Sequence, residues 1–186
     1  YGDAERFPTS ELDRPAPISP YGVTKLAAEH LCSLYASQFG LPTVSLRYFT
    51  VFGPRQRPDM AFTRFLTAAA TGREITLFGT GEQVRDFTFV DDVVEANVLA
   101  ATADLKPGTV LNIAGGTHVS VNEVLEEVAG LAGGPLDIRR VARSDGDVMR
   151  TGGDATRAAE LLGWRPRVGI VEGLARQWEW VRDRAQ

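Results

Sequence analysis

Apolar residues along the chain follow two spacings, which alternate from one segment to the next. In some stretches they recur every three or four positions, as on one face of a helix. Between these stretches lie short runs rich in β-branched and aromatic residues, which are typical of strands. The two patterns predict helices near 20–39, 60–71, 92–101, 121–131, 155–162 and 171–184, and strands near 43–49, 75–78, 84–90, 110–113 and 136–141. Helices that alternate with short strands predict an α/β fold with a parallel sheet.

Side chains suited to capping stand where several of these helices should begin. Ser, Asp and Asn accept hydrogen bonds from the first unpaired backbone N–H groups of a helix, and proline suits the first helical position. The expected caps are Ser19 (followed by Pro20), Asp91 or Asp92, Ser120 (in a capping box with Glu123) and Asp154. Glycines at positions 40, 72 and 163 are expected to end three of the helices.

The first helix carries more apolar surface than one sheet face requires. An apolar stripe of four residues is expected to face the sheet: Ala27, Leu31, Leu34 and Tyr35. Leu26 and Leu34 are displaced from the centre of this stripe. We expect this surplus to pack either against the same helix of a second subunit or against chain that precedes Tyr1.

Composition narrows the class of protein. With 186 residues, 44% hydrophobic and 24% charged, the chain can bury a core of its own. A net charge of −4 argues against binding to nucleic acid or to an anionic membrane. A single cysteine, Cys32, fits a reducing compartment, so a cytoplasmic location is expected. His30 and His118 lack partners at ligand spacing, so no metal site is predicted.

One pair of residues stands out chemically. Tyr21 and Lys25 are four positions apart at the start of the first predicted helix, so both should lie on one face. A lysine ammonium near a phenol favours the phenolate form, which makes tyrosine a usable acid/base. The chain has four tyrosines but only two lysines, so chance pairing at this spacing is rare. The simpler interpretation is two ordinary surface residues, and we favour the acid/base interpretation.

Three motifs resemble the extended branch of the short-chain dehydrogenase/reductase superfamily, the NAD-dependent epimerases and dehydratases. They are SPYGVTK at 19–25, RYFTVFGPRQ at 47–56 and RDFTFVxD at 85–92, and Tyr1-Gly2-Asp3 fits the same pattern. The resemblance implies the C-terminal part of a Rossmann-type parallel sheet with a smaller mixed α/β substrate-binding domain. Residues 1–54 would end the dinucleotide-binding domain. Residues 55–186 would form mainly the nucleotide-sugar-binding domain, with a strand and a helix returning to the Rossmann part.

The resemblance also implies what lies outside the chain. In the family, a glycine-rich turn and a catalytic Ser or Thr come before the position of Tyr1, and the chain contains no such turn. The 186 residues are therefore expected to be part of a longer enzyme and to be inactive by themselves. Within that enzyme, Tyr21 would exchange a proton with the sugar. Lys25 would support Tyr21 and bind the ribose of NAD, and Tyr48 would also contact NAD.

The family's substrate sites can be carried over to several positions. Arg85 would bind the diphosphate of a UDP-sugar, although an ion pair with Asp86 is the simpler explanation. Phe78 would lie beside the uracil, and plain core packing is an equal alternative. Arg143 and Asp147 would complete the diphosphate site, but Ser144 occupies the position expected for the arginine, so this alignment needs an insertion of one residue.

Two further positions indicate which sugar is bound. Many family members have Asn where this chain has Thr50, and Thr50 together with Arg57 resembles the UDP-glucuronate 4-epimerases. A hydroxyl and a guanidinium there would receive the C6 carboxylate. The alternative is that Thr50 only favours the strand and Arg57 is solvated.

The sequence therefore predicts an NAD-dependent UDP-sugar 4-epimerase that forms a homodimer, with UDP-glucuronate as the favoured substrate. UDP-glucose 4-epimerase is the next interpretation, followed by a nucleotide-sugar 4,6-dehydratase or decarboxylase. A non-catalytic fragment that binds UDP-sugar or dimerises is the alternative from another class of protein.

Overall fold

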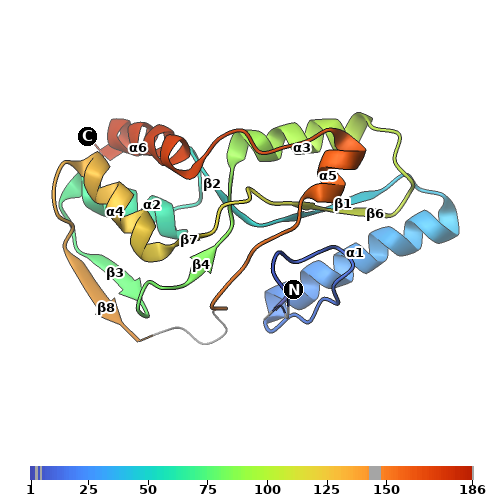
Figure 1. The fold of residues 1–186 in the computed structure, drawn as a ribbon, viewed down its shortest axis with the longest axis horizontal. Helices are drawn as coiled ribbons and strands as arrows, with labels where there is room; N and C mark the ends of the chain where they lie inside the picture. Colours follow the sequence, from blue (N-terminus) through green and yellow to red (C-terminus); the bar gives the residue numbers. More distant parts are fainter. Residues whose placement is uncertain (3, 5, 143–147, 186) are drawn as a thin grey trace.

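The computed structural model describes the whole chain except residues 3, 5, 143–147 and 186. The described residues form two groups of elements that lie at opposite ends of the molecule (Figure 1). One group contains α1, β1, β6, α3 and α5, and the other contains β3, β8, α2, α4 and α6. Short strands β2, β4, β5 and β7 lie between them.

The first group is built on two parallel strands, β1 (Val44–Tyr48) and β6 (Thr109–Ile113). Alternate residues of β1 point to opposite faces. Val44 and Leu46 pack against the core formed with α3 (Val90–Thr102) and α5 (Thr156–Leu162). The opposite face of the pair is covered by α1 (Pro20–Phe39) (Figure 1). Helices on both faces of a parallel pair are the layering expected for an α/β protein.

The second group has a larger core, which α2 (Ala61–Thr71), α4 (Val121–Ala132) and α6 (Ile170–Ala185) enclose. Strand β3 (Ile75–Phe78) pairs in parallel with β8 (Ile138–Val141), and β2 (Thr50–Phe52) pairs in parallel with β5 (Phe87–Phe89). Strand β4 (Val84–Arg85) pairs antiparallel with β7 (Val119–Ser120). The predicted α/β class with parallel pairing is confirmed.

Several predicted helix ends are confirmed by backbone geometry. Ser19 Oγ accepts a hydrogen bond from the Gly22 amide at 3.1 Å. Both halves of the Ser120–Glu123 capping box are present. Asp154 Oδ1 accepts from the Thr156 amide at 2.9 Å, although Ala155 holds the N-cap position of α5. The glycines at positions 40, 72 and 163 end their helices with left-handed backbone conformations.

The expected cap at Asp91 or Asp92 is wrong. Helix α3 begins earlier, at Val90, with Phe89 at the N-cap and no capping side chain. Asp92 is buried, and its carboxylate accepts from the Val168 amide at 3.1 Å while its carbonyl accepts from Trp164 Nε1 at 2.8 Å. The Asp92 carboxylate, which was expected to cap the helix, is thus used in a tertiary contact instead.

The single strand predicted over residues 84–90 is also wrong, because the segment contains two strands that belong to different pairs. Strand β4 pairs with β7, whereas β5 pairs with β2, and Asp86 stands between them. The Asp86 carbonyl accepts from the Thr50 amide at 3.0 Å. The chain changes partners at this residue, which the alternation of apolar and polar positions did not reveal.

The inward face of α1 differs from the predicted stripe. Leu31, Leu34 and Tyr35 are each about half exposed, and Ala27 is also exposed. The covered side instead carries smaller or polar side chains with one leucine: Gly22, Leu26, Glu29, Cys32, Ser33 and Ala36. Helix α1 therefore turns most of its large apolar side chains away from β1.

Candidate functional site

A cleft of about 1330 Å³ runs between the start of α1, the loop before it and the segment that follows β1. Five of the residues singled out in the sequence line this cleft: Tyr21, Lys25, Tyr48, Thr50 and Arg57. They come from three successive segments of the chain, so the fold brings together residues up to 36 positions apart.

Tyr21 and Lys25 stand on the first two turns of α1. The Tyr21 ring is 71% exposed, and Lys25 Nζ lies 5.3 Å from its centroid. That separation is within the range of a cation–π interaction. Gly22 allows the preceding loop to pass close to the helix, since a Cβ there would lie 2.9 Å from Pro17 Cβ. The pair therefore has the proximity and solvent access that proton exchange with a bound sugar would require.

Tyr48 ends β1, on the strand face that points toward α3. Its hydroxyl donates a hydrogen bond to Asn97 Oδ1 at 2.8 Å, and the side chain is 47% exposed. This contact holds the ring at the edge of the cleft.

Thr50 and Arg57 lie on either side of a tight turn. Gly53 in this turn has a φ of +133°, and a Cβ there would meet Val90 at 2.7 Å. The Arg57 guanidinium forms a bidentate pair with Asp59, with Nε–Oδ1 at 3.1 Å and Nη2–Oδ2 at 2.7 Å. These hydrogen bonds lower the pKa of the exposed Asp59 carboxyl. Arg57 thus pairs with a neighbouring carboxylate at the cleft, and its side chain is 74% exposed, as the solvated alternative also expects.

The sequence analysis missed a buried amide network beneath this turn. Gln177 of α6 is fully buried; its Oε1 accepts from the Gly53 amide at 3.0 Å. Its Nε2 lies 3.2 Å from both Gln56 Oε1 and Thr63 Oγ1. The signal was a glutamine three residues after Leu174, on the apolar face of the last helix. Buried amides are hydrogen-bonded in folded proteins, so a glutamine at that spacing indicates a tertiary polar contact.

The two remaining described candidates do not line the cleft. Phe78 is 41% exposed at the end of β3, and the Arg64 guanidinium lies 5.8 Å from its ring centroid. Arg85 donates hydrogen bonds to the carbonyls of Val84 at 2.9 Å and Val148 at 2.5 Å. The other two diphosphate candidates, Arg143 and Asp147, lie outside the described residues.

Asp86 is a second residue whose role the sequence analysis missed. Its side chain is fully buried, and Oδ2 accepts from the Gly153 amide at 3.2 Å. Burial raises the pKa of this carboxyl above its ordinary value; hydrogen bonds from the Gly153, Gly115 and Gly116 amides and the nearby His118 oppose the rise. The carboxyl links β5 to loops that follow β6 and precede α5.

The raised pKa of Asp86 predicts a pH-dependent stability difference. Because the folded-state pKa lies above the unfolded value of about 3.9, the stabilisation is complete below that value and is lost as pH rises through the folded pKa. Relative to Asp86→Asn, the wild-type protein should therefore lose free energy of unfolding across that window, by at most about 1.4 kcal/mol per pH unit. Urea denaturation of both proteins at several pH values measures the difference. The exposed Asp104→Asn serves as control. If the free energy of unfolding of the wild type rises with pH relative to that of Asp86→Asn, the prediction is contradicted.

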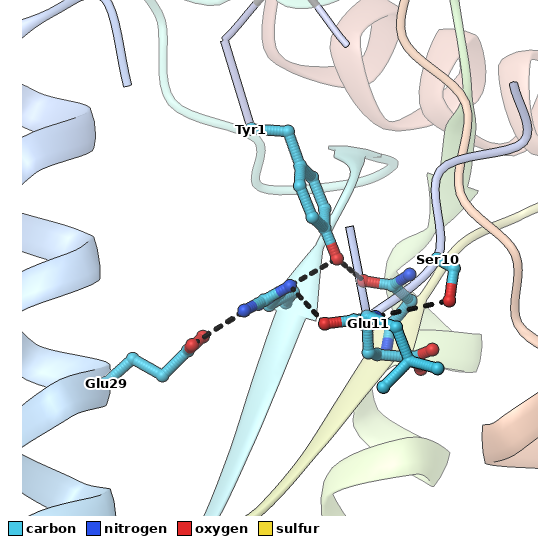
Figure 2. Close-up of polar contacts among 7 residues, drawn as sticks. Tyr1, Ser10, Glu11 and Glu29 are labelled. Atoms are coloured by element: carbon cyan, nitrogen blue, oxygen red, sulfur yellow. Dashed lines mark hydrogen bonds and ion pairs between the residues drawn. The ribbon is translucent and has the colours of Figure 1, made fainter. Parts of the chain in front are cut away.

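The third missed feature is a polar cluster around Arg47 on the α1 side of β1. The guanidinium forms a bidentate pair with Glu29 of α1, with Nε–Oε2 and Nη2–Oε1 both at 2.7 Å. The side chains of Arg47 and Glu29 are only 18% and 15% exposed. Arg47 Nη1 also donates to the Tyr1 hydroxyl, which in turn donates to Asn112 Oδ1 at 2.8 Å. Figure 2 shows Tyr1, Glu11 and Glu29 converging on this cluster from separate segments.

Comparisons with known proteins agree with this architecture. Residues 1–114 match the model of the NAD dependent epimerase/dehydratase family. The UDP-glucuronate 4-epimerase of Thermodesulfobacterium geofontis is 36% identical over 176 residues, which cover 93% of this chain and 53% of that protein. Among solved structures, the UDP-glucuronic acid 4-epimerase of Bacillus cereus in complex with UDP-glucuronic acid and NAD has a TM-score of 0.91 and 38% identity, covering 94% of this chain and 56% of its own.

A UDP-glucose 4-epimerase of Thermotoga maritima, solved with UDP-glucose, has a TM-score of 0.95 and 36% identity. The matched region covers all of this chain and 60% of the Thermotoga maritima chain. The chain thus spans little more than half the length of these relatives. The Rossmann-type α/β fold and the family resemblance read from the motifs are confirmed by these similarities.

Two features were searched for in the part of the chain that the structure describes, a metal site and a membrane-spanning helix, and neither was found there. No cluster of three or more His, Cys, Asp or Glu side chains there has a geometry that would hold a metal ion. Within the same residues, no helix combines the length and apolar character needed to cross a membrane.

Proposed function

The chain belongs to the NAD dependent epimerase/dehydratase family, and on that premise we propose that the whole protein is an NAD-dependent UDP-sugar 4-epimerase. The observation that carries the proposal is the Tyr21–Lys25 pair, which lies at the cleft with Lys25 Nζ 5.3 Å from the tyrosine ring. Tyr21 is the proposed acid/base, and Lys25 beside it is proposed to bind the cofactor ribose. The relatives described above, which include complexes with NAD and UDP-sugars, support this assignment.

The residues at the cleft fit the cofactor and the reaction. Lys25 and Tyr48 border the same cavity as Tyr21 and are proposed to hold NAD there. Bound NAD supplies the acceptor and donor of the hydride at C4, so the sugar passes through a transient 4-keto form. Tyr21 takes the proton from the 4-hydroxyl and returns it after the keto sugar has turned in the site. Return of the hydride to the other face would invert the configuration at C4.

UDP-glucuronate is the proposed substrate because a guanidinium and a hydroxyl border the cleft seven residues apart. Arg57 already binds one carboxylate, that of Asp59, through two of its nitrogens. A guanidinium has five N–H donors, so donors remain for the C6 carboxylate of a uronic acid. Thr50 adds a hydroxyl that borders the same cleft. UDP-glucose is the second candidate, favoured by the similarity to the Thermotoga maritima enzyme.

Product analysis tests the reaction directly. The whole protein, supplied with NAD and UDP-glucuronate, should form the C4 epimer with its carboxylate intact, as followed by proton NMR of the sugar. Loss of water would identify a dehydratase, and loss of CO₂ would identify a decarboxylase. No conversion of either UDP-glucuronate or UDP-glucose would favour a non-catalytic binding role.

We also propose that the chain contributes to two domains. Residues 1–54 would complete the dinucleotide-binding domain, and 55–186 would form mainly the sugar-nucleotide domain, with a strand and a helix returning to the first. In the structure α3, β6 and α5 all lie with β1. The separation of the buried side chains into two clusters supports this division. One cluster lies around β1, β6, α3 and α5, and the other is enclosed by α2, α4 and α6.

A homodimer through α1 is the proposed assembly. Leu31, Leu34 and Phe39 on this helix are 55%, 49% and 74% exposed, an apolar surface whose burial would stabilise association. The whole protein should show twice the monomer mass in light scattering at micromolar concentration, and Leu34→Glu should give a folded monomer. Leu161→Glu on α5, at a similarly exposed leucine, is the control and should leave the dimer intact.

Two results would contradict the dimer. A monomeric wild type would assign this surface to other parts of the same protein. A Leu34→Glu variant that stays dimeric would place the interface elsewhere.

A further inference from the structure

We propose that Arg47 is a positioning residue for the Tyr21–Lys25 pair: through its bidentate bond to Glu29 it sets the rotation and height of α1 over β1. This inference rests on the proposed function, since it gives Arg47 a role in the same reaction. Arg47 itself does not contact the proposed acid/base and would act through the helix that carries it.

Glu29 lies in the same row of the helix as the proposed pair. Tyr21, Lys25 and Glu29 are each four residues apart, so they are stacked on successive turns with a rise of about 6 Å from one to the next. A bidentate arginine–carboxylate pair fixes direction as well as distance, because its two N–H···O bonds are parallel. The Arg47–Glu29 pair therefore fixes the position of the helix one turn beyond Lys25 and two turns beyond Tyr21.

The inward face of α1 offers little apolar contact that could fix this position. The large apolar side chains at 31, 34, 35 and 39 are half exposed or more, and the covered side carries mainly small or polar residues. Ala36, at 8% exposure, is the one buried residue of α1, all of which is described. A second polar tether, Thr43 Oγ1 to the Cys32 carbonyl at 3.1 Å, lies farther along the helix. Polar contacts therefore carry much of the attachment of α1 to β1.

The other side of Arg47 anchors the segment that leads into α1. The Arg47 guanidinium carbon lies 4.7 Å from the Tyr1 ring centroid, and Nη1 donates to the Tyr1 hydroxyl. The Tyr1 hydroxyl in turn donates to Asn112 Oδ1 at 2.8 Å, and burial raises the pKa of this phenol. Asn112 pairs with Arg47 across the β1–β6 ladder, and its backbone N–H donates to Glu11 Oε1 at 2.7 Å.

The cluster thus connects four segments at one point: the chain at Tyr1, the loop at Glu11, helix α1 and the β1–β6 pair (Figure 2). A change at Arg47 would let the helix and the segment at Tyr1 move independently. Displacement of a reacting group by about 1 Å can reduce a rate about 100-fold. The expected effect on catalysis is therefore large although Arg47, which also borders the cleft, acts only through Glu29 and the helix.

The test compares Arg47→Met and Glu29→Gln with wild type in the whole protein. Both variants should lower kcat per NAD-loaded site, by about 10- to 100-fold for Arg47→Met, while KM for the UDP-sugar changes less than about threefold. Arg47→Lys keeps the positive charge but loses the planar guanidinium that binds Glu29 through two hydrogen bonds, so it should recover only part of kcat. Arg139→Met is the matched control: Arg139 also pairs with a glutamate, Glu74 at 2.6 Å, but on an exposed strand away from the cleft. It should keep wild-type kcat.

Amide hydrogen exchange of residues 20–39 supplies a readout that does not depend on turnover. Exchange in α1 should accelerate in Arg47→Met and Glu29→Gln but not in the control. Faster exchange with an unchanged kcat per loaded site would overturn the inference, because the cluster would then be purely structural. Unchanged exchange in both variants would also overturn the inference, whether or not the wild type has epimerase activity. Absence of epimerase activity in the wild type would by itself reject only the proposed function. If Arg47→Met does not fold, Glu29→Gln decides the same question.

Discussion

Tyr21→Phe in the whole protein is expected to lower kcat by about 10²- to 10⁴-fold, the usual contribution of a positioned acid or base. Phenylalanine keeps the ring beside Lys25 and removes only the group that exchanges a proton with the sugar hydroxyl. The affinity for UDP and for the UDP-sugar should therefore stay within about threefold of wild type, so the loss falls in kcat. Steady-state kinetics combined with calorimetric titration of UDP measures both quantities.

The control for Tyr21→Phe is the same substitution elsewhere on α1. Tyr35 is 50% exposed and does not border the cleft, so Tyr35→Phe should have wild-type kcat. A Tyr21→Phe enzyme with wild-type kcat would remove Tyr21 from the mechanism. Loss of UDP affinity in parallel with kcat would instead indicate that the variant had lost its structure around the cleft.

The second large effect concerns the choice of sugar. Wild type is expected to prefer UDP-glucuronate to UDP-glucose in kcat/KM by about ten- to a hundred-fold. A hydrogen bond to a charged group contributes about 1.5–3 kcal/mol, and each 1.4 kcal/mol corresponds to a factor of about ten. Arg57→Leu removes the guanidinium and should lower kcat/KM for UDP-glucuronate much more than for UDP-glucose.

The neutral sugar is the internal control for Arg57→Leu, because both substrates share the UDP moiety and the C4 chemistry. Equal kcat/KM of the wild type for both substrates would end the carboxylate assignment. An equal loss for both in Arg57→Leu would reassign Arg57 to the diphosphate or to the fold of the turn. Arg57→Lys is a weaker test, since it keeps the positive charge and loses only the planar fork.

Part of the site could be read from local patterns alone. Tyr21 and Lys25 share a helix, and helical geometry places residues four apart on one face whatever the rest of the chain does. The start of that helix was equally local, since Ser19 caps it and Pro20 suits its first position. Thr50 and Arg57 flank a turn of a few residues, and both border the cleft.

Contacts between distant segments were not readable in this way. The pairing of Arg47 with Glu29 and Tyr1 depends on which face of β1 meets α1, and strand alternation defines two faces without saying what covers each. The same limit explains the wrong inward stripe on α1, where the large apolar residues suggested the buried side. Gln177 beneath the Gly53 turn joins residues 124 positions apart, a separation that no local pattern spans.

The amino-acid sequence by itself determined the class of fold, the ends of most helices, the family and the proposed acid/base pair. These follow from interactions within a few residues, or from motifs that stay contiguous along the chain. Only the tertiary structure decided which face of α1 is covered, where residues 84–90 change strand partners, and that Asp86 and Gln177 are buried polar anchors and Arg47 a largely covered one. Each of these depends on the full set of segments competing for the same buried surface and the same hydrogen-bond donors, and that competition is resolved only when the chain has folded.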